Sequence, residues 1–130
     1  MSEHTYAVDV RLRDVDFMGH VNNAVYATYL EEAREQLFSR VVGESLVELD
    51  TVLASMTIEY DRPVHADEAV TIDVRIPELG ESSVPLEYEL RADGELAATG
   101  RTVQVFVDPE SGGSTPIPST VRDSLSSVVE

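Results

Sequence analysis

The chain contains no cysteine, no tryptophan and no lysine among its 130 residues. Without cysteine it cannot form a disulfide or a cysteine-ligated metal site. Without lysine the phosphate-binding loop of nucleotide hydrolases cannot be completed, and neither the dinucleotide motif G-x-G-x-x-G nor the serine hydrolase motif G-x-S-x-G occurs. Disulfide scaffolds, nucleotide-binding loops and serine hydrolase triads are therefore disfavoured.

Long apolar runs are also missing, because no stretch approaches the roughly 18 to 20 residues that a membrane-spanning helix needs. The first five residues have neither the basic nor the apolar segment of a secretory signal, so a cytoplasmic location is expected. The three histidines, His4, His20 and His65, do not show a metal-ligand spacing with acidic residues. We expect no metal and no redox cofactor.

Positive charge is scarce, since 25 acidic residues face nine basic ones, all of them arginine, giving a net charge of −16. Such a charge repels nucleic acids and anionic membranes, so neither is an expected partner. The acids are spread along the whole chain and form no acidic tail. Dispersed acidity without lysine predicts adaptation to a salt-rich cytoplasm, where screening makes self-repulsion tolerable.

Hydrophobic periodicity predicts one domain over residues 1–130, with a single long helix from about Asn22 to Arg40. Its apolar positions recur every three or four residues, Asn22 or Asn23 can cap its start, and Gly43 follows its end. The segment after Pro118 predicts a short terminal helix. The apolar face of the long helix consists of Tyr26, Leu30, Ala33 and Leu37.

Alternating apolar residues predict one strand before the helix and four after it. The residues 92–95, Ala-Asp-Gly-Glu, indicate a hairpin between the last two strands. The chain is therefore expected to be an α+β protein, in which a curved antiparallel sheet of about five strands wraps one helix and a second copy covers its outer face or edges. The strand signals lie at residues 6–12, 56–60, 70–76, 84–90 and 96–107.

Polar groups are concentrated between the first strand and the helix, over residues 14–23. A helix start offers unpaired N–H groups that can stabilise an oxyanion, and a carboxylate beside it can activate water or attack a carbonyl. Asp16 is the strongest catalytic candidate, although an aspartate in a loop often only binds nearby backbone amides. Asp14, at the strand end, is expected to be a solvated loop residue.

Three neighbours of Asp16 are candidate substrate-binding residues. His20 can contact substrate, move a proton or order the loop, because its unperturbed pKa lies near 6.5. Gly19 permits a positive φ or a close approach to a ligand. The backbone amides from Gly19 to Asn23 matter more than the side chains, since one well-placed oxyanion donor contributes about 10²- to 10³-fold in rate.

The residues 13–23, R-D-V-D-F-M-G-H-V-N-N, with Tyr26 and Tyr29 behind them, resemble the hot-dog-fold acyl-CoA thioesterases, most closely the 4-hydroxybenzoyl-CoA thioesterase type. The similarity extends over nearly the whole chain, because residues 58–64 and 100–108 also resemble strands of that family. It implies a hot-dog fold and an acyl-CoA thioesterase that hydrolyses an acyl-CoA thioester to free acid and CoA. In this resemblance Asp16 is the catalytic carboxylate and the N–H near Asn23 polarises the thioester carbonyl.

The same resemblance implies further contacts and an assembly. The candidate substrate-binding residues are Gly19, His20, Asn22, Asn23 and Tyr26, with Arg62 and Arg101 as weak candidates for the CoA phosphates. It also implies a homodimer or homotetramer, with the active site where one subunit's helix start meets the strands of its neighbour.

One departure from the family pattern and two alternative functions remain open. Plant acyl-ACP thioesterases carry an Asn two residues after the Asp, where this chain has Met18, so an Asn/His-assisted mechanism does not transfer. One alternative is a non-catalytic hot-dog protein that binds an acyl-CoA or an acyl carrier. Another is a related dehydratase, for which His65 is the only basis. The acyl group and the choice between dimer and tetramer cannot be read from the sequence.

Overall fold

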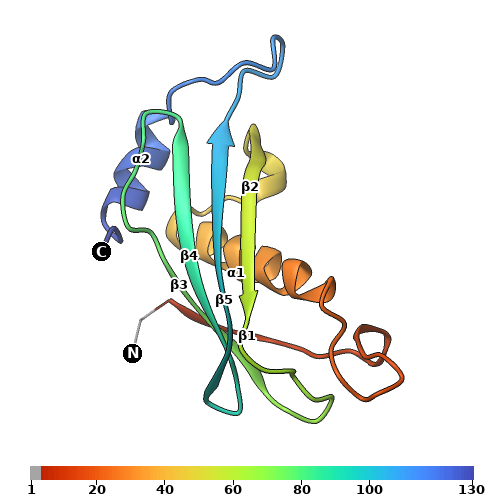
Figure 1. Ribbon diagram of the computed structural model, residues 1–130. Helices are drawn as coiled ribbons and strands as arrows, with labels where there is room; N and C mark the ends of the chain where they lie inside the picture. Colours follow the sequence, from red (N-terminus) through yellow and green to blue (C-terminus); the bar gives the residue numbers. More distant parts are fainter. Residues whose placement is uncertain (1–3) are drawn as a thin grey trace.

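The computed structural model describes residues 4–130, and five antiparallel strands form one curved sheet beside a long helix (Figure 1). This arrangement confirms the predicted α+β class and the five-stranded sheet. In the sheet the strand order is β1-β3-β4-β5-β2, so β2 forms one edge. The elements are β1 (Thr5–Val8), α1 (Val25–Val41), β2 (Thr51–Tyr60), β3 (Val70–Arg75), β4 (Ser83–Ala92), β5 (Glu95–Phe106) and α2 (Ser119–Ser126), with short 3₁₀ turns at Leu12–Asp14 and Leu46–Glu48.

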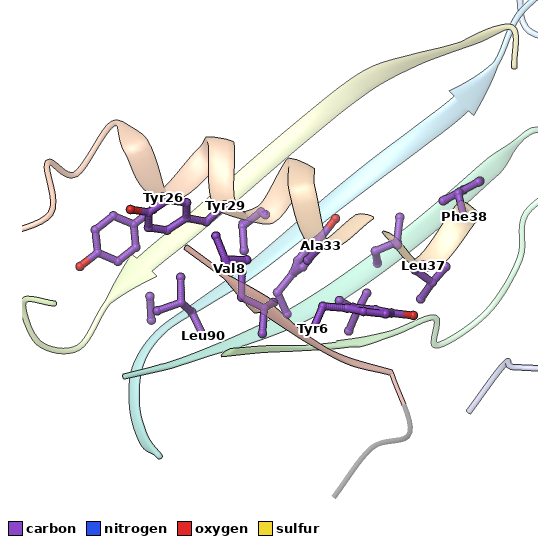
Figure 2. Packing of buried hydrophobic residues seen from close by; sticks show 14 of the residues in the cluster. Tyr6, Val8, Tyr26, Tyr29, Ala33, Leu37, Phe38 and Leu90 are labelled. Atoms are coloured by element: carbon purple, nitrogen blue, oxygen red, sulfur yellow. The ribbon is translucent and has the colours of Figure 1, made fainter. Parts of the chain in front are cut away.

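The core lies between α1 and the sheet, as the helical periodicity predicts. Tyr26, Leu30, Ala33 and Leu37 are each at most 2% exposed. Figure 2 shows Tyr26, Ala33 and Leu37 on the side of α1 that faces the strands. The helix approaches β5 so closely that a Cβ atom on Gly100 would lie 2.8 Å from the Leu30 Cδ1 atom. Gly100 therefore faces α1, and its lack of a side chain lets the helix lie directly on the sheet.

The first strand is shorter than the sequence pattern predicts. It ends at Val8, and the chain then turns through the 3₁₀ turn, leaving Leu12 91% exposed. Only four residues of this edge strand pair with β3, from Thr5 opposite Asp73 to Val8 opposite Val70. Alternation alone therefore overestimated the strand, because pairing with β3 does not continue past Val8.

The boundaries of α1 also differ slightly from the prediction. The helix begins at Val25, and its cap residue Ala24 makes no capping bond with its own side chain. Instead the Asn22 Oδ1 atom accepts the Ala24 N–H at 2.9 Å, so Asn22 stabilises the helix start from just outside it. At the other end Gly43 has φ +84° and donates its N–H to carbonyls of the last turn, as predicted for a C-terminal glycine.

The edge strand β2 remains partly uncovered on the face that α1 occupies. Tyr60 and Leu53 pair with Ala98 and Gln104 of β5, whose inner positions face the helix, yet they are 46% and 41% exposed. On its outer face β2 exposes Val52 at 49%. Because these apolar residues lie on an unpaired edge, β2 is a surface on which another strand can add.

Within residues 4–130, no helix has both the length and the apolar character required to cross a bilayer.

Candidate active site

The loop that precedes α1 folds back on itself as a small hairpin (Figure 1). Val15 and Val21 form an isolated antiparallel bridge, and the Asp16 N–H donates to the His20 carbonyl at 2.8 Å. At the tip Gly19 has φ +81°, a conformation that strongly favours glycine. The tight turn holds Asp16 and His20 on adjoining sides of the hairpin, immediately ahead of the helix.

The Asp16 carboxylate is anchored through only one of its oxygens. Its Oδ1 atom accepts the Met18 N–H at 2.9 Å and the His20 N–H at 3.1 Å. Among residues 4–130, no donor lies within hydrogen-bond distance of the Oδ2 atom, and the side chain is exposed. Both roles considered for Asp16 are therefore compatible with this geometry, since one oxygen orders the loop and the other is available for chemistry.

The start of α1 leaves one backbone amide available, seven residues after Asp16. The Asn22 N–H donates to the Asp14 carbonyl at 2.8 Å, and the Ala24 N–H donates to the Asn22 side chain. Within the described part of the chain, the Asn23 N–H has no acceptor. Asn23 is exposed, so its amide lies at the helix start where a substrate carbonyl oxygen can accept it.

Tyr60, which was not among the candidate site residues, contacts this helix start. Its hydroxyl donates to the Asn23 carbonyl at 2.9 Å, so the end of β2 is tied to the peptide that follows the free amide. The only signal for this contact in the sequence is the position of Tyr60 at the end of an alternating strand, which does not reveal what its hydroxyl binds.

Asp14 is buried, and the expectation of a solvated loop residue was wrong. Its Oδ2 atom accepts the Tyr29 hydroxyl at 2.7 Å and the Arg11 N–H at 2.9 Å. Burial alone would raise its pKa, but these hydrogen bonds and the charges of Arg13 and Arg11 together lower the pKa of Asp14. For Tyr29, burial and the bond to Asp14 raise the pKa of the hydroxyl well above its ordinary value. The pair fastens the loop to α1.

The two histidines nearest the loop lie together. His20 and His65 form an isolated antiparallel bridge, and their rings meet edge to face with centroids 4.8 Å apart. Two hydrogen bonds flank this bridge. The Val21 N–H donates to the Val64 carbonyl, and the Ala66 N–H donates to the Gly19 carbonyl. Residues 64–66 therefore hold the backbone of residues 19–21 in place. Among residues 4–130, no three His, Asp or Glu side chains form a group that could hold a metal ion.

Tyr26 lies in the core and not at the surface where substrate would dock. It is 1% exposed and lies among the buried side chains of the core (Figure 2). Its ring packs edge to face on Tyr60 with centroids 4.9 Å apart. Its position does not support direct contact with substrate. Its contribution to the site is to hold the ring of Tyr60 in place.

Arg62 and Arg101 each lie within ion-pair distance of a glutamate. Both terminal nitrogens of Arg62 donate to the Glu68 carboxylate, at 3.1 and 2.8 Å, and its Nε atom lies 3.3 Å from Glu95. Arg101 follows Gly100, which faces α1, so its side chain projects from the opposite face of the sheet, where it lies 4.0 Å from Glu87. The sequence pattern did not separate these structural ion pairs from ligand-binding cations.

A hollow of about 690 Å³ lies farther along α1, beside the start of β2. It contains the buried Arg34, whose guanidinium donates to the Tyr88 hydroxyl at 3.1 Å. Residue 34 lies nine positions beyond the helix start, so this hollow is about 13 Å along α1 from the end that follows the Asp16 loop. Its walls include Glu31, Glu35, Leu46, Leu53 and Gln104.

Comparison with known proteins finds similarity over most of the chain. A sequence model described as the thioesterase-like superfamily matches residues 10–125. A thioesterase of Thermus thermophilus, crystallised with coenzyme A and Zn, is 39% identical, with a TM-score of 0.86, and the match covers 95% of this chain and 91% of that one. The hot-dog fold implied by the motif is thereby confirmed.

Two curated proteins add to this comparison. The uncharacterised protein YsmA of Bacillus subtilis is 36% identical over 81% of this chain and 73% of its own length. The long-chain acyl-CoA thioesterase FadM of Escherichia coli is 25% identical over 95% of this chain and 97% of its own. The similarity thus covers most of each protein and is not confined to the loop before α1.

Proposed function

Because this chain belongs to the thioesterase-like superfamily and is a hydrolase of acyl-CoA thioesters, we propose that Asp16 is its catalytic carboxylate and the Asn23 N–H its oxyanion donor. Two observations carry the proposal: one Asp16 oxygen makes no hydrogen bond among the described residues, and neither does the Asn23 amide at the start of α1. Both residues are exposed, Asp16 within the hairpin loop and Asn23 between the loop and the helix.

In the general-base route, the free oxygen of Asp16 takes a proton from water as the water oxygen attacks the thioester carbon. The carbonyl oxygen becomes negative and is held by the Asn23 N–H and the positive end of α1. The C–S bond then breaks, the sulfur leaves as the CoA thiolate, and a proton restores the thiol. The products are a free acid and CoA.

In the nucleophilic route, the same oxygen attacks the thioester carbon directly and the CoA thiolate leaves. The resulting acyl–Asp16 anhydride is then hydrolysed by water, which regenerates the carboxylate. Both routes need the same two groups. A single turnover in ¹⁸O-labelled water distinguishes them, because hydrolysis of the anhydride at the Asp16 carbonyl leaves ¹⁸O in the protein and the general-base route does not.

The test of Asp16 is the variant Asp16→Asn, whose side-chain oxygen still accepts the amides of Met18 and His20. We expect kcat to fall about 10²- to 10⁴-fold in a thiol-release assay, with the fold unchanged by circular dichroism. Asp108→Asn is the matched control. The Asp108 Oδ1 atom accepts the N–H of Glu110, two residues later in the chain, just as Asp16 accepts that of Met18, but this turn lies outside the site. Full activity of Asp16→Asn across acyl-CoA substrates would eliminate the proposed role.

A non-catalytic acyl-CoA-binding protein makes the opposite prediction for the wild type. It binds acyl-CoA in calorimetry but releases no thiol over time. A screen of short, long and aromatic acyl-CoAs decides between the two, and it also identifies the acyl group. Support for the 4-hydroxybenzoyl-CoA thioesterase type comes from the D-x-D-x-x-G motif at residues 14–19, and preference for aromatic thioesters in this screen would establish it.

We further propose that the active unit is at least a homodimer, formed by antiparallel pairing of β2 with its copy. The uncovered apolar edge of β2 supports this pairing. Two-fold symmetry would bring the Tyr60 end of one β2 toward the Thr51 end of the other. The hollow beside Thr51 of the second copy would then lie near Asp16 of the first and provide space for the acyl group.

A further inference from the structure

We propose that Arg11 and Arg13 form the site that binds the phosphates of the CoA moiety. The inference rests on the proposed thioesterase function and identifies the part of the protein that holds the nucleotide end of that substrate. In this proposal Arg11 and Arg13 take the phosphate-binding role for which the sequence suggested Arg62 and Arg101. The side chains of Arg62 and Arg101 lie in ion pairs with glutamates.

Arg11 and Arg13 differ from the other seven arginines in having no partner. Within residues 4–130, neither guanidinium makes an ion pair, a hydrogen bond or a ring contact, and both side chains are exposed. Each of the others is engaged: Arg34 with Tyr88, Arg40 with the ring of Tyr6, Arg62 with Glu68, Arg75 with Glu87, Arg91 with Asp73, Arg101 with Glu87 and Arg122 with the carbonyl of Gly80.

Unpaired cations are unexpected in a chain with 25 acidic residues and nine basic ones. Surface carboxylates greatly outnumber the arginines, so an arginine without a function would readily find an acidic neighbour. The charges of both arginines act on Asp14. Burial alone would raise the pKa of this carboxyl, and the positive charges of Arg13 and Arg11 help to lower it. Asp14 is already occupied by the Tyr29 hydroxyl and the Arg11 N–H, so both guanidinium groups remain available to a ligand.

Their distance from the reacting group suits a CoA thioester. Arg13 and Arg11 precede Asp16 by three and five residues, so the Cα atoms of Arg11 and Asp16 are at most about 18 Å apart. In CoA the pantetheine arm separates the sulfur from the diphosphate, so the phosphates must bind away from Asp16 and not beside it. Two long side chains at the beginning of the hairpin loop meet this requirement, whereas a cation adjacent to Asp16 would not.

The chemistry of guanidinium also fits the ligand. Arginine binds phosphate oxygens through parallel N–H donors and retains its charge at any physiological pH. A CoA thioester brings several negative charges to a protein of net charge −16, so it requires a local positive site. The surrounding loop also exposes apolar side chains that can cover the uncharged parts of CoA, with Leu12 91%, Phe17 97% and Met18 65% exposed.

The test is the double variant R11Q/R13Q assayed with three thioesters of one acyl group: acyl-CoA, acyl-dephospho-CoA and acyl-pantetheine. For acyl-CoA we expect KM to rise about 10- to 100-fold at low salt with kcat within twofold of wild type, because each lost phosphate contact contributes about tenfold. For acyl-pantetheine, which has no phosphate, KM should not change. The response to acyl-dephospho-CoA reports whether the 3′-phosphate or the diphosphate is bound.

R75Q/R91Q is the matched control, because it removes the same charge from residues paired with Glu87 and Asp73 on the sheet. An equal rise of KM in this control, or an equal rise for acyl-pantetheine, would overturn the proposal. A change of molar mass without a change of KM would assign Arg11 and Arg13 to a contact between copies instead. If the wild type hydrolysed none of the thioesters, the proposed function itself would fail, a result distinct from each of these.

Discussion

At the scale of single residues, the hydroxyl of Tyr60 connects the sheet to the proposed oxyanion donor. It binds the Asn23 carbonyl at 2.9 Å, while its ring rests on the buried Tyr26. The peptide next to the free amide is thus held by a strand outside the helix. Preorganised donors contribute to rate because they need no rearrangement as charge develops, so we expect this contact to aid catalysis by the proposed site.

Tyr60→Phe removes that hydrogen bond and keeps the ring. We expect kcat to fall about tenfold with KM nearly unchanged, since the amide is less well positioned while substrate contacts remain. Urea unfolding should show a loss of only about 1 kcal/mol. Tyr88→Phe is the control, because it removes a buried hydroxyl that binds Thr102 and Arg34 away from the helix start. Equal reductions of kcat in both variants would show that general destabilisation is responsible.

At the residue scale, the sequence predicts proximity only where a local pattern is sufficient. Asp16 and the amides that follow it belong to one short hairpin, and their nearness to a helix start is visible in the sequence. Asp14 was misjudged because its burial depends on Tyr29, fifteen residues away, and on the direction of a side chain in a 3₁₀ turn. The ion pairs of Arg62 were not predicted, since Glu95, one of its two partners, lies in β5 and is 33 residues away in the sequence.

At the scale of elements, periodicity predicted α1, its buried face and the β4–β5 hairpin, because each is specified by local spacing. Asp93 and Gly94 have φ values of +49° and +83°, as a tight two-residue turn requires. The order of strands was not predictable in the same way. The chain leaves β2 at one edge and returns as β3 beside β1, and this crossing depends on long-range packing that alternation does not encode.

The double variant Val52→Glu/Leu53→Glu tests whether the uncovered edge strand β2 forms the dimer interface. An isologous interface repeats each new carboxylate on both copies, so like charges would meet across the two-fold axis. We expect the wild type to have at least twice the chain mass in light scattering and the variant to be monomeric and inactive. The exposed pair Glu110→Gln and Asp123→Asn serves as a surface control. A wild-type monomer with full activity would contradict the proposed dimer.

The segment after β2 is held by an ion pair that responds to acid. The bidentate bond from Arg62, with the His65 N–H, lowers the pKa of Glu68 to about 2. Since this is below the unfolded value near 4.5, the stabilisation is complete above about pH 4.5 and is lost as the pH falls toward 2. Because solvent screens this pair, its contribution to stability at neutral pH is about 1 kcal/mol or less.

Urea unfolding of the wild type and Glu68→Gln should therefore differ by about 1 kcal/mol or less at pH 6, with the difference shrinking between pH 5 and 3. Glu110→Gln, which alters an exposed loop side chain, should show no such trend. The KM for acyl-CoA should remain unchanged in Glu68→Gln, because Arg62 has a structural role here. A pH-independent difference would contradict the assigned cause.

At the scale of the whole molecule, the charges are distributed with a clear division of roles. Four of the arginines form ion pairs with acidic residues. Arg75, Arg91 and Arg101 do so on the sheet, and Arg62 pairs with Glu68, so few positive charges remain to neutralise the other acidic residues. Most of the 25 acids cannot be neutralised by the nine arginines, and their repulsion opposes the compact state. The stability of the fold must then depend on the ionic strength of its surroundings.

We accordingly expect thermal stability to increase with KCl. Repulsion among exposed carboxylates is screened over about 10 Å at 0.1 M salt and about 3 Å at 1 M, so Tm should rise by several degrees from dilute buffer to molar KCl. Calorimetry at a series of KCl concentrations measures this, and sucrose at matched osmolality controls for water activity. The Arg62–Glu68 pair, which is partly buried, should weaken much less than the surface repulsion. A Tm that is independent of salt would refute adaptation to a salt-rich cytoplasm, and it would mean that the acidic residues are too far apart in the folded chain for their repulsion to matter.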